Sequence, residues 1–214
     1  MQSVISRAAN KFFHHIALSR YAYYFDVIIN NPGYKEILFA DVRDIIFQDD
    51  PFNFELESDL YFFLEDDKYN LRTQNYIWLK NLFGEEIFKR IGEDRVICSG
   101  TTYGKRDAML HYCEQMCLEQ LKHIHSVAGF DGYDQGVHNY LIHTGKFDKA
   151  TLCENFKGPI LTMHGVEKKR FVFNDAGKLI NEDGHVIPVL HQYDRHYQYS
   201  LLENKLLLYP ADYN

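Results

Sequence analysis

Hydrophobic positions along this chain change spacing several times, from a helix-like pattern to a strand-like pattern and back. Apolar and aromatic residues recur every three to five positions from Ser3 to about Ile29, which predicts a helix or a helix pair. The Asn-Asn-Pro-Gly sequence at residues 30–33 ends this segment, because these residues favour turns. The short apolar run at residues 37–40 then predicts a strand that is buried on both faces, inside a parallel or mixed sheet with helices on either side.

The same alternation continues through the chain and predicts an α/β fold. Further strands are predicted at residues 60–64, 95–98 and 160–163, and further helices at residues 75–90, 106–125 and 134–141. Between residues 171 and 190, short apolar runs separated by the turn sequences Asn-Asp-Ala-Gly and Glu-Asp-Gly predict a small antiparallel β appendage. The pattern contains no internal repeat and no linker, so we expect one domain over residues 1–214.

Composition and charge exclude several classes of protein. The 214 residues are 46% hydrophobic and include 16 Tyr, 16 Phe and only 5 Pro, which is typical of a folded domain and not of a disordered chain. The formal charge of -7 argues against a nucleic-acid partner, because proteins that bind the phosphate backbone carry a basic excess. No apolar run approaches the ~18 residues of a membrane span and no secretory signal opens the chain, so we expect a cytoplasmic protein.

The four cysteines form no Cys-x-x-Cys pair, which argues against a zinc ribbon or a disulfide scaffold. Cys113 and Cys117 lie four residues apart and therefore share one face of a predicted helix. We expect all four cysteines to be buried free thiols. The chain also lacks a Gly-x-Ser-x-Gly elbow, a P-loop and a Gly-x-Gly-x-x-Gly sequence, which removes the usual support for a serine hydrolase, an NTPase or a dinucleotide oxidoreductase.

The strongest chemical feature is the pair of carboxylates Asp41 and Asp44, directly after the predicted strand at residues 37–40. Open α/β sheets bind ligands at the carboxyl ends of their strands, and Mg²⁺ or Mn²⁺ prefers oxygen ligands held by such a loop. In an extended chain these two side chains would point to opposite faces, so joint binding requires a turn at Val42 and Arg43. In the alternative interpretation, Asp44 caps a short turn and Arg43 pairs with a surface carboxylate.

Three segments of the chain resemble GT-A nucleotide-sugar glycosyltransferases. An apolar strand, the motif Asp41-x-x-Asp44, an apolar run and an Asp-Pro pair look like the metal-binding segment of that fold. Residues 98–104, Cys-Ser-Gly-Thr-Thr-Tyr-Gly, resemble the small-residue loop that follows a central strand. Residues 133–139, Tyr-Asp-Gln-Gly-Val-His-Asn, are similar to the Asp-Gln-Asp-x-x-Asn segment of glycogenin-like and lipopolysaccharide galactosyltransferases. The resemblance covers about residues 20–196 and implies a GT-A-like (Rossmann-like) mixed sheet flanked by helices.

The resemblance implies a transferase that moves a sugar from a nucleotide-sugar donor to a glycan or another acceptor. In this family a late histidine completes the metal shell, which makes Asp41, Asp44 and His191 the expected ligands of Mn²⁺ or Mg²⁺. A mixed oxygen and imidazole shell suits Mn²⁺, which tolerates nitrogen better than Mg²⁺ does. The family's Asp-Gln pair lies beside the transferred sugar, and the resemblance gives this catalytic role to Asp134 and Gln135.

Four further residues are expected to contact the donor. Ser99 and Gly100 lie in the segment that resembles the donor or acceptor loop. The family's late His-x-x-Gly-x-x-Lys-Pro-Trp pattern is absent after His191, and we expect Arg195 to replace its phosphate contact. Arg43 is expected to offset the diphosphate charge as well, because guanidinium groups match phosphate oxygens in a bidentate way.

The chain departs from the family at its front. Only one helical segment precedes the acidic motif, so roughly two βα units, on the order of 60 residues, are missing and we expect an N-terminally truncated fold. A partner chain or Tyr21, Tyr23 and Tyr24 would then hold the base, although aromatic residues at this spacing are more often core. An exposed sheet edge would favour a homodimer. The alternative function is a non-catalytic remnant or assembly module without a complete donor pocket.

Other polar residues have less specific patterns. His138 is either a substrate contact or a structural hydrogen-bond partner, and His164 and His196 are alternative metal ligands. The acidic runs at residues 49–50 and 65–67 are expected to be solvated surface, and the basic run at residues 166–170 either binds an anion or protects a hairpin edge. A metal-dependent phosphoesterase would need a second carboxylate cluster about 4 Å from the first metal, and none is evident in the sequence.

Overall fold

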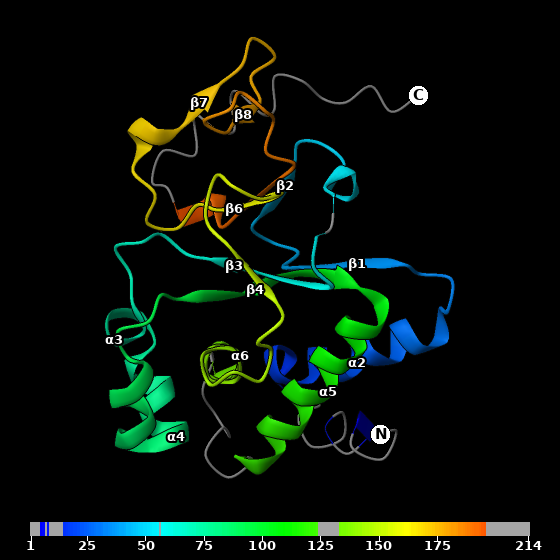
Figure 1. The fold of residues 1–214 in the computed structure, drawn as a ribbon, viewed down its shortest axis with the longest axis vertical. Coiled ribbons are helices and arrows are strands. Elements are labelled where there is room, and N and C mark those ends of the chain that lie inside the picture. Colours follow the sequence, from blue (N-terminus) through cyan, green and yellow to red (C-terminus); the bar gives the residue numbers. More distant parts are fainter. Residues whose placement is uncertain (1–4, 7, 9–14, 56, 124–132, 196–214) are drawn as a thin grey trace.

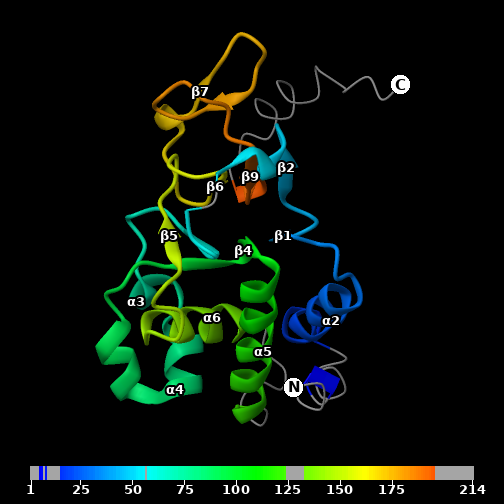
Figure 2. The ribbon, with the colours of Figure 1, turned by 45° about the vertical axis from the view of Figure 1, so that its right-hand side comes forward.

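The computed structural model describes residues 5–6, 8, 15–55, 57–123 and 133–195 and shows an α/β fold with mixed sheets flanked by helices. Figures 1 and 2 show the layers. Helices cover one face of a four-stranded sheet, and a three-stranded sheet lies on the other side and carries a two-stranded hairpin at its far end. The α/β prediction is therefore confirmed at the level of fold class.

The four-stranded sheet has the order β1-β4-β3-β5 and contains antiparallel and parallel pairs. Its members are β1 (Glu36–Ala40), β3 (Leu60–Leu64), β4 (Ile97–Lys105) and β5 (Thr151–Cys153). β4 pairs antiparallel with both β1 and β3, and β3 pairs parallel with β5. All five residues of β3 are buried, as expected for a Leu-Tyr-Phe-Phe-Leu run in a sheet that is covered on both faces.

β1 lies at the edge of this sheet and not in its interior, which corrects one prediction. Only Phe39 in this strand is buried, and Glu36 is exposed. The apolar run is explained by contacts on both faces, because Phe39 belongs to the core under the helices while Leu38 packs against the cluster on the opposite face. The homodimer prediction depends on such an edge, and the dimer itself stays a prediction.

Four of the described helices form a layer on one face of the large sheet (Figure 1). They are α2 (Ile16–Asn30), α4 (Tyr76–Ile91), α5 (Arg106–Lys122) and α6 (Tyr133–His143), with the single-turn helix α3 (Leu71–Gln74) beside α4. Tyr112 of α5 and Val137 of α6 pack with Phe62 of β3 in the main core. Tyr21 is also fully buried in this core, while Tyr23 is half exposed, so the core interpretation is right for Tyr21.

The three-stranded sheet has the order β2-β9-β6. It contains β2 (Ile45–Phe47), β6 (Ile160–Thr162) and β9 (Val189–His191), and β9 pairs antiparallel with β2 and parallel with β6. The prediction that residues 186–190 complete the hairpin appendage is therefore wrong for Val189 and Leu190, which are buried in this sheet. Only β7 (Val172–Phe173) and β8 (Leu179–Ile180) form the hairpin, with Val186 bridged to Ile180.

The buried side chain of Gln48 attaches this hairpin to the three-stranded sheet. Its amide nitrogen donates to the carbonyl oxygens of Ile187 (2.8 Å) and Leu179 (3.1 Å), and its oxygen accepts from the Leu179 N–H (2.8 Å). A buried amide paired in this way specifies one geometry. Three short 3₁₀ helices complete the described elements: η1 (Pro51–Asn53), η2 (Lys168–Arg170) and η3 (Tyr193–Arg195).

Residues 99–104 belong to β4, so the prediction of a small-residue loop there is wrong. Thr101, Thr102 and Tyr103 have high β propensity, and each pairs with a residue of β1. Glycine is required in this strand by close neighbours, because a Cβ atom at Gly104 would lie 2.6 Å from the carbonyl oxygen of Asp59.

All four cysteines are free and buried, as predicted from their spacing. Cys113 and Cys117 lie on the core-facing side of α5. Burial raises the pKa of both thiols, which keeps them protonated at neutral pH. Within the described part of the chain, no helix combines the length and the apolar character needed to cross a membrane.

Candidate metal centre and adjoining cavity

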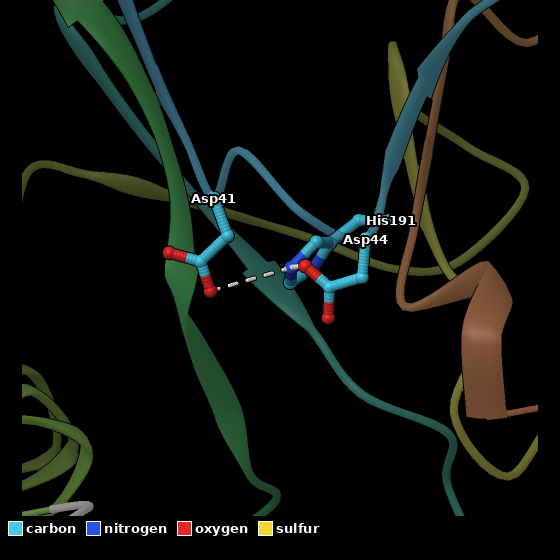
Figure 3. A group of neighbouring side chains, drawn as sticks. All are labelled: Asp41, Asp44 and His191. Atoms are coloured by element: carbon cyan, nitrogen blue, oxygen red, sulfur yellow. Dashed lines mark ion pairs between the residues drawn. The ribbon is translucent and has the colours of Figure 1, made fainter.

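Asp41, Asp44 and His191 lie together where the two larger sheets meet, and Figure 3 shows their side chains pointing toward one another. Asp41 follows β1, Asp44 precedes β2, and the chain bends at residues 42–44 between them. The pairing of β2 with β9 places Ile45 opposite His191. The turn that joint binding requires is therefore present, and strand pairing supplies the late histidine.

The three side chains offer two carboxylate oxygens and one imidazole nitrogen within 4.8 Å of one another. His191 Nε2 lies 3.7 Å from Asp41 Oδ2 and 3.7 Å from Asp44 Oδ1. These distances leave His191 Nε2, a fully buried atom, without a hydrogen-bond partner among the described residues. A divalent cation between these atoms would satisfy it, so the donor set fits a metal site, while the identity of the metal does not follow from these residues alone.

The electrostatic surroundings also favour a cation at this point. Burial lowers the pKa of His191, but the Cys98 sulfur and the carboxylates of Asp41 and Asp44 outweigh it and raise the pKa to about 10. Burial raises the pKa of Asp41, but His191 and Arg20 outweigh it and hold that pKa below its usual value. The surroundings therefore favour positive charge at this point, and a metal ion would bind there by displacing the proton from His191.

Gly100 of β4 provides the space in which the three side chains meet. A Cβ atom at this position would lie 2.6 Å from Asp41 Oδ2 and 2.6 Å from His191 Cε1. The backbone of Gly100 also accepts a hydrogen bond from the Asp41 N–H at 3.0 Å, which fixes the end of β1. The sequence prediction placed Gly100 at the donor site, and the structure shows that the absence of a side chain at Gly100 lets Asp41 and His191 approach β4.

Arg20 of α2 is a site residue that the sequence analysis missed. Its guanidinium donates to Asp41 Oδ1 (2.8 Å), to Asp134 Oδ2 (2.5 Å) and to the carbonyl oxygen of Ser99 (3.0 Å). Its side chain is only 14% exposed. The only signal in the sequence was a single arginine within a helix rich in aromatic residues, which is not specific. The guanidinium joins the metal-binding residues to the first turn of α6.

A cavity of about 430 Å³ adjoins the candidate metal centre, and most of the residues predicted to contact the donor line this cavity. Asp41, Ser99, Gly100, Asp134, Gln135 and Arg195 all line it. The side chain of Gln135 accepts from the Ser99 N–H at 2.7 Å, and the Ser99 hydroxyl donates to Asp134 at 3.4 Å.

Arg43 lies outside the residues that line this cavity. Its side chain is 81% exposed, and its guanidinium lies 3.5 Å from Asp194. The alternative interpretation of the sequence, a surface ion pair, therefore describes Arg43. Asp44, which that interpretation made a turn cap, is buried beside His191.

Glu65 corrects the prediction that residues 65–67 are solvated surface. Glu65 and Asp66 are 5% and 6% exposed, and only Asp67 is exposed as expected. Glu65 directly follows the buried strand β3, and its N–H donates to the Val96 carbonyl at 2.9 Å, which keeps it at the level of the sheet. Its carboxylate lines the cavity and accepts from Gln135 Nε2 at 3.3 Å. The acidic run itself gave no sign of this burial, because it resembles ordinary surface, and the burial follows from the strand that precedes it.

His138 and His164 do not belong to the candidate metal-binding group. His138 is fully buried and its Nδ1 lies 2.8 Å from the Tyr112 hydroxyl, so the structural interpretation is right. His164 lines the cavity with Nδ1 3.4 Å from Glu65 Oε2 and its ring stacked on Tyr69. His196 lies outside the described residues.

Comparison with known proteins adds no family assignment, since no protein-family model matches this chain and no curated protein is significantly similar to it. One group of at least three metal-ligating side chains is found among the described residues, and it is the group at Asp41. A second group of carboxylates, which a two-metal phosphoesterase would need, is not found in that part of the chain.

Proposed function

We propose that this protein transfers a sugar from a nucleotide-sugar donor to an acceptor with the help of a divalent cation, Mn²⁺ or Mg²⁺. The observation that carries the proposal is the convergence of Asp41, Asp44 and His191 beside a polar cavity that also contains Asp134 and Gln135. The residues come from segments far apart in the chain. Asp41 and Asp44, and Asp134 and Gln135, lie in two of the three segments that resemble GT-A transferases, and His191 is the late histidine that the resemblance implies. An accidental surface cluster would not be expected to reproduce this combination.

Each residue type suits a step of glycosyl transfer. Asp41, Asp44 and His191 would hold the cation, which neutralises the diphosphate as it leaves. The bond to the departing oxygen breaks through an oxocarbenium-like state, so the site needs a negative or polar group facing the sugar ring. The Asp134 carboxylate and the Gln135 amide lie on the cavity wall at the start of α6 and provide such groups. Arg195, on the same cavity, would bind phosphate oxygens.

Calorimetry with UDP and GDP tests the proposal, each measured with Mn²⁺ and again after chelation of the metal. We expect one of the nucleotides to bind only when Mn²⁺ is present. Asp44→Ala and His191→Ala should weaken this binding at least about tenfold, because each removes a ligand atom. Asp49→Ala is the matched control, since Asp49 is an exposed carboxylate that does not line the cavity.

Two outcomes would contradict the proposal. Nucleotide binding that is indifferent to chelation and to both substitutions would remove the metal from the mechanism. A folded protein that binds neither nucleotide with Mn²⁺ would favour the alternative function, a non-catalytic remnant or assembly module.

A further inference from the structure

Part of the cavity is not used by the donor site proposed above. Glu65, Asn75, Trp78 and His164 line it. They come from the end of β3, from the start and first turns of α4, and from the segment after β6. None of them belongs to the metal-binding group. These four residues are called the Glu65 subsite below.

Hydrogen bonds connect the Glu65 subsite to the residues expected to face the transferred sugar. Gln135 donates to Glu65 at 3.3 Å and accepts from the Ser99 N–H at 2.7 Å. The Ser99 hydroxyl in turn donates to Asp134, which is bound by Arg20. A molecule bound at Glu65 would therefore lie on the same wall of the cavity as the group bound at Asp134 and Gln135.

Polar side-chain atoms of the Glu65 subsite are buried without short hydrogen bonds to the described residues. The two side-chain contacts of the Glu65 carboxylate are long, 3.3 Å to Gln135 and 3.4 Å to His164, although the residue is 5% exposed. The side-chain oxygen of Asn75, a residue 2% exposed, has no hydrogen-bond partner in the described part of the chain. Buried carboxylates and amides normally have short hydrogen bonds, so these atoms indicate a ligand that donates several.

Trp78 adds an aromatic surface to these polar groups. It is partly exposed and lines the cavity. Its backbone is held close to α6 by Gly136, where a Cβ atom would lie 3.1 Å from Trp78 Cβ. The ring of His164 is held by stacking on Tyr69, with 4.9 Å between the ring centroids. An aromatic face beside buried hydrogen-bond acceptors suits a ligand with an apolar face and a rim of hydroxyl groups.

We propose that the Glu65 subsite binds the acceptor and that the acceptor is a saccharide, an inference that rests on the proposed function. A pyranose ring has C–H faces that pack on an aromatic ring and hydroxyl groups that donate to carboxylate and amide oxygens. The buried carboxylate disfavours an anionic acceptor because it would repel it. In this arrangement Glu65 binds the acceptor hydroxyl groups, and Trp78 supports the ring.

Fluorescence provides a direct test, because Trp78 is the single tryptophan of the chain. Methyl glycosides of glucose, galactose, mannose and N-acetylglucosamine would be titrated into the protein with UDP and Mn²⁺. We expect at least one of them to change the tryptophan emission saturably. Glu65→Gln should raise its dissociation constant about tenfold or more, because a hydrogen bond to a charged group is lost. Ile77→Ala should leave it unchanged, since Ile77 is exposed next to Trp78 and does not line the cavity.

Saturation-transfer NMR with the same glycoside gives a second measurement in case Glu65→Gln does not fold. Trp78→Ala should weaken the saturation-transfer signal strongly, and Trp78→Phe should retain most of it. Mn²⁺-dependent nucleotide binding without any response to the four glycosides would refute the saccharide subsite and leave the donor site standing. Glycoside binding that depends on Glu65 in a protein that binds no nucleotide would refute the transferase proposal and leave a saccharide site. Glycoside binding unaffected by the Glu65 and Trp78 substitutions would also refute the subsite.

Discussion

Gly100→Ala tests the metal centre with the smallest change that the chain allows. The added methyl group would lie 2.6 Å from Asp41 Oδ2, 2.6 Å from His191 Cε1 and 2.9 Å from His191 Nε2. Ordinary contacts of a Cβ atom begin near 3.4 Å, so the neighbouring atoms must move by about 0.8 Å. His191 is fully buried between neighbouring strands, while the Asp41 side chain is 39% exposed. Asp41 is therefore the group that should move.

The two effects of this substitution have different magnitudes. Overpacking at a closely packed site costs about 1–3 kcal/mol, and this exceeds the ~0.5–1 kcal/mol that alanine gains over glycine within a strand. Moving Asp41 also separates a carboxylate from the other two ligand atoms and disturbs its 2.8 Å bond with Arg20. Loss of an outer-shell group that orients a metal ligand typically costs about 10–100-fold in metal affinity, and displacement of the ligand itself should cost at least as much. We therefore expect a modest loss of stability and a large loss of Mn²⁺ binding.

The assay is calorimetric titration of Mn²⁺ into metal-free protein, together with urea denaturation in the presence of a chelator. Gly33→Ala is the matched control, because nothing lies within 4 Å of a Cβ atom at Gly33 and its φ is ordinary. We expect Gly33→Ala to bind Mn²⁺ as the unsubstituted chain does. If Gly100→Ala binds Mn²⁺ with unchanged affinity, the cation is not held by Asp41 and His191 and the proposed metal site is wrong.

Two further predictions concern buried charge. Arg20→Met should lower the free energy of unfolding, measured in urea, by about 3–5 kcal/mol, because it leaves the Asp134 carboxylate, 7% exposed, without its cation. Arg72→Met is the control and should cost under about 1 kcal/mol, because the ion pair of Arg72 with Glu93 is exposed. Equal losses for the two variants would contradict the reasoning. Burial lowers the pKa of His138 from 6.5 to about 3, so the folded state excludes a proton that the unfolded state binds. The free energy of unfolding therefore carries no penalty from His138 above pH 6.5 and falls by about 1.4 kcal/mol per pH unit as the pH drops toward 3. In urea denaturation at several pH values, His138→Gln should remove this contribution to the pH dependence of the free energy of unfolding. The same pH dependence in both proteins would refute the prediction.

Segments with a strong periodic pattern could be predicted from the sequence alone. The apolar run at residues 60–64 is β3 with the same bounds, and the predicted helices at residues 75–90 and 134–141 correspond to α4 and α6 within two residues at each end. β2 and β5, each of three residues, were not predicted from the sequence. Their formation depends on partners elsewhere in the chain, such as β9 for β2.

β4 shows why local composition misled the prediction around residues 99–104. Serine and glycine are typical of loops, and the local sequence does not show which residues pack against them in the folded protein. Here Gly100 is required because Asp41 and His191 approach the strand, and Gly104 because the Asp59 carbonyl does. Glycine within a strand can mark such a close approach. The two glycines that suggested a loop therefore mark the points where other segments contact the strand.

Asp41, Asp44 and His191 could be brought together by resemblance to a known motif, whereas Arg20 and Glu65 could not. The position of Arg20 depends on how α2 packs against the large sheet. The contacts of the buried core fix this packing, and they are not visible in the local sequence. Glu65 belongs to an acidic run that resembles ordinary surface, and its burial follows from the strand β3 that precedes it. Residues whose role depends on tertiary packing have no local pattern to identify them.

The charge of the cavity gives a reason why a metal would be required and not merely helpful. Asp41, Asp134 and Glu65 contribute three carboxylates to its lining, and Arg20 is already paired with two of them. Arg195 is the only other guanidinium group among the described lining residues. A nucleotide diphosphate entering this cavity would therefore meet net negative charge, in a protein whose formal charge is already -7. A divalent cation at Asp41, Asp44 and His191 would cancel the charge of its two carboxylate ligands and so remove most of the repulsion at the point where the phosphates would lie. Donor binding should accordingly vanish on chelation, instead of weakening slightly.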